Sequence, residues 1–209
     1  HHCIIAEGKP REIPSDGSNR GCFCYAQRHE GRQADLPVPE QTGYCRFFVR
    51  QYPGRYDTGR VEGREAQQGM KALVDTCIIV DFLQAREPFA ESARAVLRAA
   101  ASELCLCCIT AKSATDIYYL THRCTHNDKE SRSKLEQLLS VAGMLDSAAD
   151  DVLRAIPSEI SDFEDAVMIE TAVRSGMDCI ITRNTKDYAR SVIPVYTPKQ
   201  FVRLLEQEG

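Results

Sequence analysis

The sequence lacks any excess of positive charge. Its 209 residues carry 26 Lys and Arg against 30 Asp and Glu, a formal net charge of −4. Such a chain has no overall basic field that would attract nucleic acid or a membrane surface. Binding to either polyanion therefore has to come from a local group of basic side chains.

The sequence also lacks long apolar segments. No run reaches the roughly 18 apolar residues that a membrane-spanning helix needs, and the N-terminus has no basic stretch followed by an apolar one, as a signal peptide would. We therefore expect a cytoplasmic protein with no membrane partner. Most cysteines after residue 70 lie in apolar runs, so we expect reduced thiols that pack as small hydrophobic residues.

Residues 1–69 have little that could form a core. They hold nine of the 12 Gly, five of the nine Pro and a single leucine, Leu36. Such a segment cannot bury enough apolar surface to offset the entropy of ordering. We predict Met70, the first methionine, as the natural start, with residues 1–69 either translated from an upstream region or forming a disordered extension. The cysteines there lack the usual zinc spacings, so no zinc site is expected.

Residues 70–209 have the size of one domain and alternate between two kinds of pattern. Short apolar runs typical of buried strands lie at 71–75, 104–110, 144–148, 178–182 and 193–198. Apolar residues at helical spacing lie at 76–85, 88–101, 111–124, 128–142, 149–158, 161–176 and 197–207. The alternation predicts an α/β domain, in which a parallel sheet is covered by helices on both faces.

Four signals mark where predicted helices begin and end. Thr76 is placed to cap the first helix, and Ser161 with Glu164 fits a capping box at the start of the late helix. Gly176 is placed to close that helix. Thr197, followed by Pro198 and Gln200, is a start signal for the last helix.

Carboxylates follow the predicted strands, where an α/β sheet presents groups to a ligand. Asp75 ends the first strand, and it can serve either as a helix cap or as a ligand. In the late helix, Asp165 lies in line with Ile169 and Ala172, so its carboxylate should point inward and need a partner such as a metal ion. Asp162, three residues earlier, faces a similar direction.

Further polar groups lie near the same edge. Asp116 also leans inward on its helix, and Lys112 can form an ordinary helical ion pair with it. Asn184 and Asp187 follow the strand at 178–182 and can be ligands or plain loop residues. Several acids at one sheet edge repel one another, and a divalent cation relieves that repulsion; oxygen ligands favour Mg²⁺ or Mn²⁺ over zinc.

A metal site of this kind suits attack of an activated water on a phosphodiester. The motifs of nucleotide-cofactor proteins are missing, since the chain has neither a Walker loop nor a G-x-G-x-x-G pattern. The D-x-D-x-T pattern of aspartyl-phosphate enzymes is also missing, because Thr76 and Cys77 follow Asp75. Phosphotransfer is therefore the least favoured function.

Four stretches together resemble a known family. They are "KALVDTCIIVDFL", "SATDIYYL", "DFEDAVMIETAVRSGMDCIITRNTKDY" and "IPVYTPKQF". They are similar to the PIN domain, and specifically to the VapC-like toxins of bacterial type II toxin–antitoxin pairs. The resemblance covers essentially all of residues 70–209 and none of residues 1–69.

The resemblance implies a Rossmann-like sheet and a ribonuclease dependent on Mg²⁺ or Mn²⁺. It also implies a homodimer and a cognate antitoxin protein that blocks the site. The implied catalytic group matches Asp75, Asp116 and Asp165, with Asn184 or Asp187 after the fourth strand. The metal would be held by Asp75 and Asp165, with Asn184 and, as a further contributor, Asp162.

The chain departs from the family at three positions in or beside this group. Cys77 stands where many relatives have Asn, Asp116 where the acid is commonly Glu, and Asn184 where some have Asp. We expect any loss of metal affinity or activity to arise at these positions, whereas the fold should be unaffected.

Two functions from different classes stay open. The first is a metal-dependent endoribonuclease, and the second is a non-catalytic PIN module that binds RNA or a protein partner. Four cations are candidates for holding RNA phosphates, unless they are ordinary solvated charges: Lys112, Arg123, Arg183 and Lys186. A binding module should tolerate loss of the carboxylates of Asp75 and Asp165, and a nuclease should not.

Overall fold

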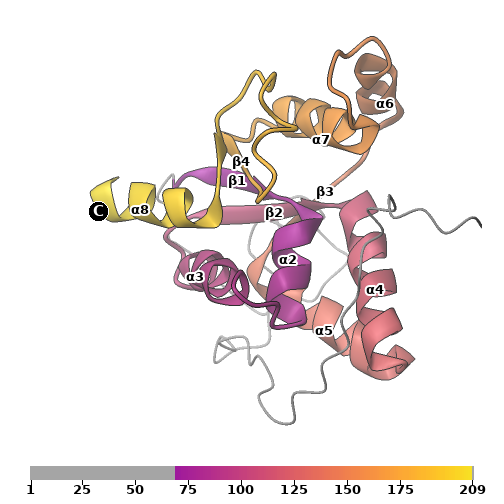
Figure 1. Ribbon diagram of the computed structural model, residues 1–209, viewed down its shortest axis with the longest axis vertical. Coiled ribbons are helices and arrows are strands. Elements are labelled where there is room, and N and C mark those ends of the chain that lie inside the picture. Colours follow the sequence, from indigo (N-terminus) through magenta and orange to yellow (C-terminus); the bar gives the residue numbers. More distant parts are fainter. Residues whose placement is uncertain (1–68, 209) are drawn as a thin grey trace, which may run out of the picture. The chain divides into compact units, whose positions relative to one another are not determined.

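The computed structural model describes residues 69–208 of the chain. The predictions for residues 1–68, namely disorder, upstream translation and the absence of zinc, lie outside this range. The domain boundary at residue 70 therefore stays a prediction. Within the described range the fold is the predicted α/β architecture (Figure 1).

Five short strands form one sheet in the order β3-β2-β1-β4-β5. They are β1 (Lys71–Val74), β2 (Leu106–Thr110), β3 (Gly143–Leu145), β4 (Cys179–Ile181) and β5 (Val195–Tyr196). Every neighbouring pair is parallel, so the predicted parallel sheet is confirmed. Because all strands run the same way, their carboxyl ends share one edge.

Seven helices connect or follow the strands in the described part of the chain. They are α2 (Thr76–Leu83), α3 (Ala90–Ala101), α4 (Ala111–Thr125), α5 (Asp128–Val141), α6 (Ala149–Ala155), α7 (Phe163–Arg174) and α8 (Pro198–Glu208). Within residues 69–208, no helix is both long enough and apolar enough to cross a membrane.

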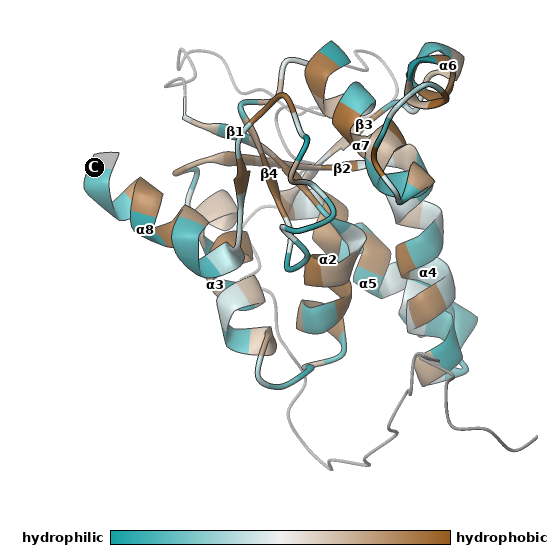
Figure 2. Cartoon of the chain, turned by 45° about the horizontal axis from the view of Figure 1, so that its top comes forward, coloured by the Kyte–Doolittle hydropathy of each residue, from teal (hydrophilic) through white to brown (hydrophobic). Residues whose placement is uncertain are grey.

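The sheet is buried on both faces, as predicted. Successive residues of a strand face opposite sides, and in β1 this sends Ala72 and Val74 to one core and Leu73 to another. The first core is covered by α2, α3, α4, α5 and α8, and the second by α7. Figure 1 shows these two layers, with α6 beside α7. The strands are strongly apolar, whereas the helices carry both apolar and polar residues (Figure 2).

Two of the predicted caps, Thr76 and Ser161, are wrong by one residue, whereas the alternative interpretation of Asp75 as a helix cap is confirmed. The cap of α2 is Asp75 rather than Thr76, since its side chain accepts a hydrogen bond from the Cys77 amide. The cap of α7 is Asp162, so the capping box of Ser161 and Glu164 does not form. In both cases an aspartate adjacent to the predicted cap accepts the first free amides of the helix, which removes the need for a hydroxyl there.

The other two signals are confirmed. Gly176 follows α7 with a φ of 62°, the left-handed conformation that glycine adopts without strain. Before α8, the amide of Gln200 donates to Oγ1 of Thr197, and the side chain of Gln200 accepts from the Thr197 amide. These reciprocal bonds satisfy amides that the helix itself leaves without partners.

Candidate acidic site

The candidate site lies where β1 and β4 end. Asp75 directly follows β1 and Thr182 directly follows β4, and the Asp75 amide donates to the carbonyl of Ile181 at 2.9 Å. The buried hydroxyl of Thr182 donates to Oδ2 of Asp75 at 2.7 Å. Two residues that are 107 positions apart in the chain are thus brought into contact because their parallel strands are neighbours.

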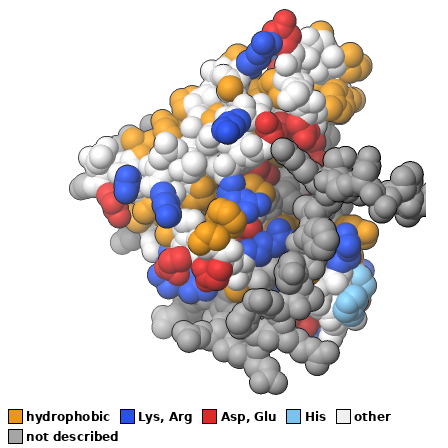
Figure 3. All heavy atoms as spheres, in the orientation of Figure 1, with side chains coloured by type: hydrophobic (Ala, Val, Ile, Leu, Met, Phe, Trp, Pro, Cys, Tyr) orange, Lys and Arg blue, Asp and Glu red, His pale blue; other side chains and the backbone are white. Residues whose placement is uncertain are grey.

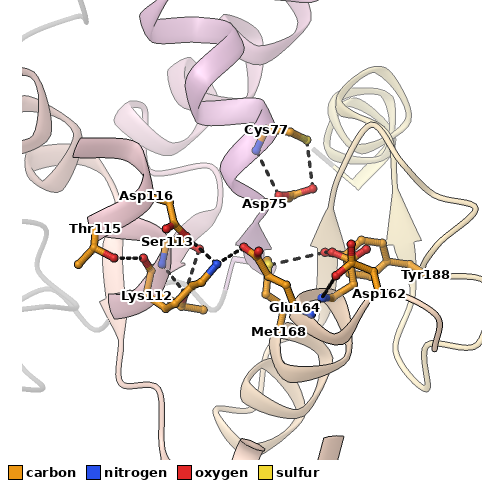
Figure 4. A network of polar contacts seen from close by, with 12 residues as sticks. Asp75, Cys77, Lys112, Ser113, Thr115, Asp116, Asp162, Glu164, Met168 and Tyr188 are labelled. Atoms are coloured by element: carbon orange, nitrogen blue, oxygen red, sulfur yellow. Dashed lines mark hydrogen bonds and ion pairs between the residues drawn. The ribbon is translucent and has the colours of Figure 1, made fainter. Parts of the chain in front are cut away.

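Asp75 is both the cap of α2 and a group at the sheet edge. Its Oδ1 accepts from the Cys77 amide at 3.1 Å, and its Oδ2 accepts from the Cys77 thiol at 3.1 Å (Figure 4). Burial, together with the nearby charge of Asp75, raises the pKa of Cys77 to about 11. The thiol therefore stays protonated at neutral pH, and the Asp75 carboxylate is fixed by three donors.

Asp165 lies in the first turn of α7 and is half-buried. Its Oδ1 accepts a hydrogen bond of 2.7 Å from the hydroxyl of Tyr188. Burial raises the pKa of Asp165 to about 6; the bond from Tyr188 opposes this rise, and repulsion by Asp162, Asp75 and Asp187 adds to it. The predicted inward orientation of Asp165 is confirmed, and it lies in the electrostatic field of three other acids.

Asp162 and Asp187 complete this group of four acids. Asp162 is exposed and accepts from the amide of Glu164 at 2.9 Å, so its carboxylate serves the start of α7. The side-chain amide of Asn184 donates to Oδ2 of Asp187, and the backbone amide of Asn184 donates to Oγ1 of Thr182 at 3.0 Å. The loop after β4 therefore presents one amide and one carboxylate beside Asp75 and Asp165.

Asp116 belongs to a separate pair of acids joined by a lysine. Nζ of Lys112 lies 2.7 Å from Oδ2 of Asp116 and also forms an ion pair with Glu164 (Figure 4). Partial burial alone would lower the pKa of Lys112, but its two acidic partners raise it. Lys112 thus ties α4 to the start of α7, and its charge is shared by two carboxylates.

The candidate RNA-binding cations have different surroundings. Nε of Arg183 lies 3.1 Å from Oδ2 of the fully buried Asp81, and its guanidinium sits 4.4 Å from the centre of the Phe89 ring. Burial raises the pKa of Asp81, and the charge of Arg183 opposes that rise. Arg183 therefore has a structural partner, although part of its side chain stays exposed.

The other two cations are more open. Arg123 lies over the ring of Tyr119 on α4, and Lys186 is exposed in the loop after β4. On the face seen in Figure 3, both basic and acidic side chains are present. This mixture agrees with the small net charge of the chain.

The oxygen atoms that the side chains of the candidate site offer are of the kind that a hard divalent cation binds. They belong to carboxylates and one amide, and within residues 69–208 no Lys or Arg forms an ion pair with Asp75, Asp162, Asp165 or Asp187. In the same described range, however, no three His, Cys, Asp or Glu side chains are arranged to hold a metal ion. Binding an ion would therefore require some of these side chains to turn toward a common point.

Comparison with protein families matches residues 71–186 to the PIN domain. The chain belongs to the PIN domain family. Comparison with the curated proteins found no match.

Several solved structures resemble this PIN domain. One is VapBC2 from Rickettsia felis bound to a promoter DNA fragment, with 16% identity and a TM-score of 0.47, covering 61% of this chain and 98% of that one. Another is VapC20 from Mycobacterium tuberculosis, described as a Sarcin-Ricin loop cleaving toxin, with 15% identity, a TM-score of 0.45, and coverage of 57% and 94%. A third is PAE2754 from Pyrobaculum aerophilum, with 18% identity, a TM-score of 0.46, and coverage of 71% and 99%. The family assignment rests on the match over residues 71–186.

Three residues around the site of this PIN domain were missed by the sequence analysis. Thr182 and Tyr188 hold the two central acids, and Asp81 holds Arg183. Asp81 interrupts an apolar run, which is a signal for a buried acid with a partner, since acids are rarely buried unless paired. Thr182 and Tyr188 carry no such signal, because their roles depend on which distant acid they meet.

Proposed function

We propose that this PIN domain is a metal-dependent endoribonuclease that hydrolyses RNA phosphodiester bonds at its acidic edge. The observation that supports this is the meeting of four acids, Asp75, Asp162, Asp165 and Asp187, at the ends of β1 and β4 and the start of α7. Partial burial, together with their repulsion, raises the pKa of Asp165. A site that holds like charges together in this way is suited to a cation.

In this proposal Asp75 and Asp165 hold Mg²⁺ or Mn²⁺, with Asp162, Asn184 and Asp187 near enough to contribute. A divalent cation, when bound, activates a water and stabilises the leaving oxygen of a phosphodiester. Ligands of this kind are effective when other groups fix their orientation. Thr182 and Cys77 do this for Asp75, and Tyr188 does it for Asp165.

The remaining candidates have supporting roles in the proposal. Asp116 lies across the site on α4, where Lys112 holds it near the start of α7. Arg183 and Lys186 follow β4 directly, so they are placed to attract the phosphates that flank the cleaved bond. The charge of Lys112 is already shared by two acids, and it would have to leave one of them to contact RNA.

We further propose that the protein is the toxin of a type II toxin–antitoxin pair. It would act in the cytoplasm as a homodimer and be blocked by a cognate antitoxin. What supports this is the likeness of the four sequence stretches to VapC-like toxins. The choice of RNA would depend on single-stranded contacts around the acidic edge.

Three observations favour a second candidate, a PIN module that binds RNA or protein without cleaving. Both oxygens of Asp75 already accept hydrogen bonds, and Asp187 is bonded to Asn184. Within residues 69–208 no three potential ligands are arranged around an ion. A module that never binds metal would look like this, so the experiment has to include the metal directly.

The test is cleavage of a mixed single-stranded RNA by the purified full chain with Mg²⁺, with Mn²⁺ and with EDTA. Asp165→Asn is the test variant and Asp150→Asn is the matched control, because Asp150 is an exposed acid of α6 that pairs with Arg154 away from the site. The nuclease proposal expects cleavage that needs metal, disappears in Asp165→Asn and survives in Asp150→Asn. A folded wild type that cleaves none of several RNAs with either metal favours the binding module.

A further inference from the structure

Phe89 is a large apolar residue that the fold leaves exposed near the acidic edge. It stands at the start of α3, and 40% of the residue is exposed. A single exposed apolar residue is common on protein surfaces, but this one also has a charged group stacked on it. The guanidinium of Arg183 lies 4.4 Å from the centre of the Phe89 ring, well within the range of a cation–π contact.

Arg183 is held over this ring by a buried acid. Its Nε lies 3.1 Å from Oδ2 of Asp81, which has no exposed surface. Neither carboxylate oxygen of Asp81 has a hydrogen-bond partner among residues 69–208. A buried carboxylate without an opposite charge is costly, so the guanidinium has to stay beside Asp81. The Arg183 side chain is thus fixed in place, while 32% of it remains exposed.

Arg183 also connects the Phe89 ring to the acidic edge. It directly follows Thr182, whose hydroxyl donates to Asp75, and its side chain interacts with the Cys77 thiol that donates to the same carboxylate. At 1.5 Å per residue of α2, Asp81 lies about 9 Å along the helix axis from Asp75. Neighbouring nucleotides of one RNA strand can therefore reach both the acids and the ring.

The two side chains match what an unpaired nucleotide requires. Proteins that hold single strands combine positive charge for the phosphates with flat π surfaces for the bases. A base stacks either on an aromatic ring or on the plane of an arginine guanidinium. Phe89 and Arg183 offer both kinds of surface at one place, whereas an apolar contact with a protein would have no need of the charge.

We propose that Phe89 and Arg183 form a stacking subsite for one unpaired nucleobase beside the phosphodiester that is cleaved. The inference rests on RNA as the substrate of the proposed function, and it adds a specific contact that requires the RNA to be single-stranded. In a duplex each base is already stacked and paired, so its flat face is not available to a side chain.

The test uses the absence of tryptophan from the sequence. Phe89→Trp places the only tryptophan of the chain at the subsite, where stacking of a base quenches its fluorescence. Leu104→Trp is the matched control, because Leu104 is 60% exposed and precedes β2, at the opposite edge of the sheet. Each full chain is titrated with a short single-stranded RNA of mixed sequence in EDTA, so that binding is measured apart from metal-dependent cleavage. We expect quenching of Phe89→Trp and none of Leu104→Trp.

Affinities for the same RNA, labelled and followed by fluorescence anisotropy in EDTA, provide the second measurement. Phe89→Ala should weaken binding by roughly fivefold to a hundredfold, the range that loss of one stacked base gives. The dependence of affinity on salt should be unchanged, because the ring carries no charge. Phe89→Tyr should keep the wild-type affinity, as should Leu104→Ala. Thermal unfolding of each variant checks that the fold is retained.

Two results would overturn the inference and leave the proposed nuclease in place. One is RNA that binds without quenching Phe89→Trp, and the other is a folded Phe89→Ala variant that binds RNA as tightly as the wild type. A chain that binds no RNA in EDTA would also overturn it, while cleavage with metal decides the nuclease separately. Quenching in a protein that cleaves no RNA with either metal would support the subsite and favour the non-catalytic RNA-binding module.

Discussion

Replacing Asp165 by Asn should stabilise the metal-free protein at neutral pH while it removes activity. The reason is that Asp165 is half-buried and repelled by Asp162, Asp75 and Asp187, which raises its pKa to about 6. At pH 7.5 the folded protein therefore has to hold an unfavourable charge. Asn has nearly the same shape, carries no charge, and its amide oxygen can still accept the bond from Tyr188.

The magnitude follows from the shift in pKa. The pKa of Asp165 rises from 3.8 to about 6, and each pKa unit corresponds to about 1.4 kcal/mol of free energy. The charge thus costs at most roughly 3 kcal/mol at pH 7.5, a figure that already includes the hydrogen bond from Tyr188, and solvent screening of the half-buried carboxylate reduces it further. The net gain in the free energy of unfolding should be about 1 to 2 kcal/mol. For a domain of this size, that corresponds to a rise in Tm of roughly 3 to 6 °C.

The gain should depend on pH with a definite sign. A carboxyl group whose pKa is raised by folding contributes stability below its unfolded pKa, and that contribution is lost as the pH rises through the folded value. The advantage of Asp165→Asn should accordingly be full above about pH 6.5 and nearly absent at pH 4. Thermal and urea unfolding in EDTA at both pH values measure it.

The matched control for this prediction is Asp150→Asn, which removes an exposed charge that is paired with Arg154. It should change stability by less than about 1 kcal/mol at either pH. An Asp165→Asn variant that is no more stable than wild type at pH 7.5 would contradict the unfavourable charge assigned to Asp165. A gain in stability that is the same at pH 4 and pH 7.5 would contradict it as well.

Two further predictions concern residues outside the metal-binding group. Asp151 is buried and accepts hydrogen bonds from Thr171 at 2.9 Å and from Arg174 at 2.6 and 2.9 Å; Asp151→Ala should therefore lower the free energy of unfolding by about 3 kcal/mol. These donors lower the pKa of Asp151 despite its burial. The stability that the Asp151 carboxylate contributes should therefore be present above about pH 4 and lost below it. Urea unfolding across this pH range that shows no such loss would contradict the prediction. The Cys77 thiol, with a pKa of about 11, should resist iodoacetamide at pH 8 in the folded protein, whereas the exposed Cys124 should be alkylated. Peptide mass spectrometry measures the labelling of both, and equal labelling would contradict the assigned environment of Cys77.

Much of the fold could be predicted from local sequence patterns. The apolar runs at β1, β2 and β4 are buried strands, and the alternation with helices gave the parallel sheet and its two covered faces. Hydrophobic periodicity determines such features because each element has to bury its own apolar side chains. The predicted caps Thr76 and Ser161 lie one residue from the caps in the structure, although Asp75 was also a candidate, since several side chains in each stretch could have served as the cap.

The site could be predicted only in part. Asp75 and Asp165 were identified because strand ends and an inward helical stripe are visible in the sequence. The donors that hold them were not, since Thr182 is 107 residues from Asp75 and Tyr188 is 23 residues from Asp165. Such contacts depend on how strands and helices pack in three dimensions, and no spacing along the chain encodes them. The second ion pair of Lys112, which joins α4 to Glu164 on α7, could not be predicted for the same reason.

The chemistry of the product ends tests most directly whether water activated by a metal at the acidic edge cuts RNA. RNA cleaved by the full chain with Mn²⁺ would be analysed for its terminal groups, with EDTA and Asp165→Asn reactions beside it. Attack by water leaves a linear phosphate and a hydroxyl, because the neighbouring 2′-hydroxyl of the RNA takes no part. We expect these ends alone, and only when the metal ion and the Asp165 carboxylate are both present. Products ending in 2′,3′-cyclic phosphate, or cleavage that persists in EDTA or in Asp165→Asn, would contradict it.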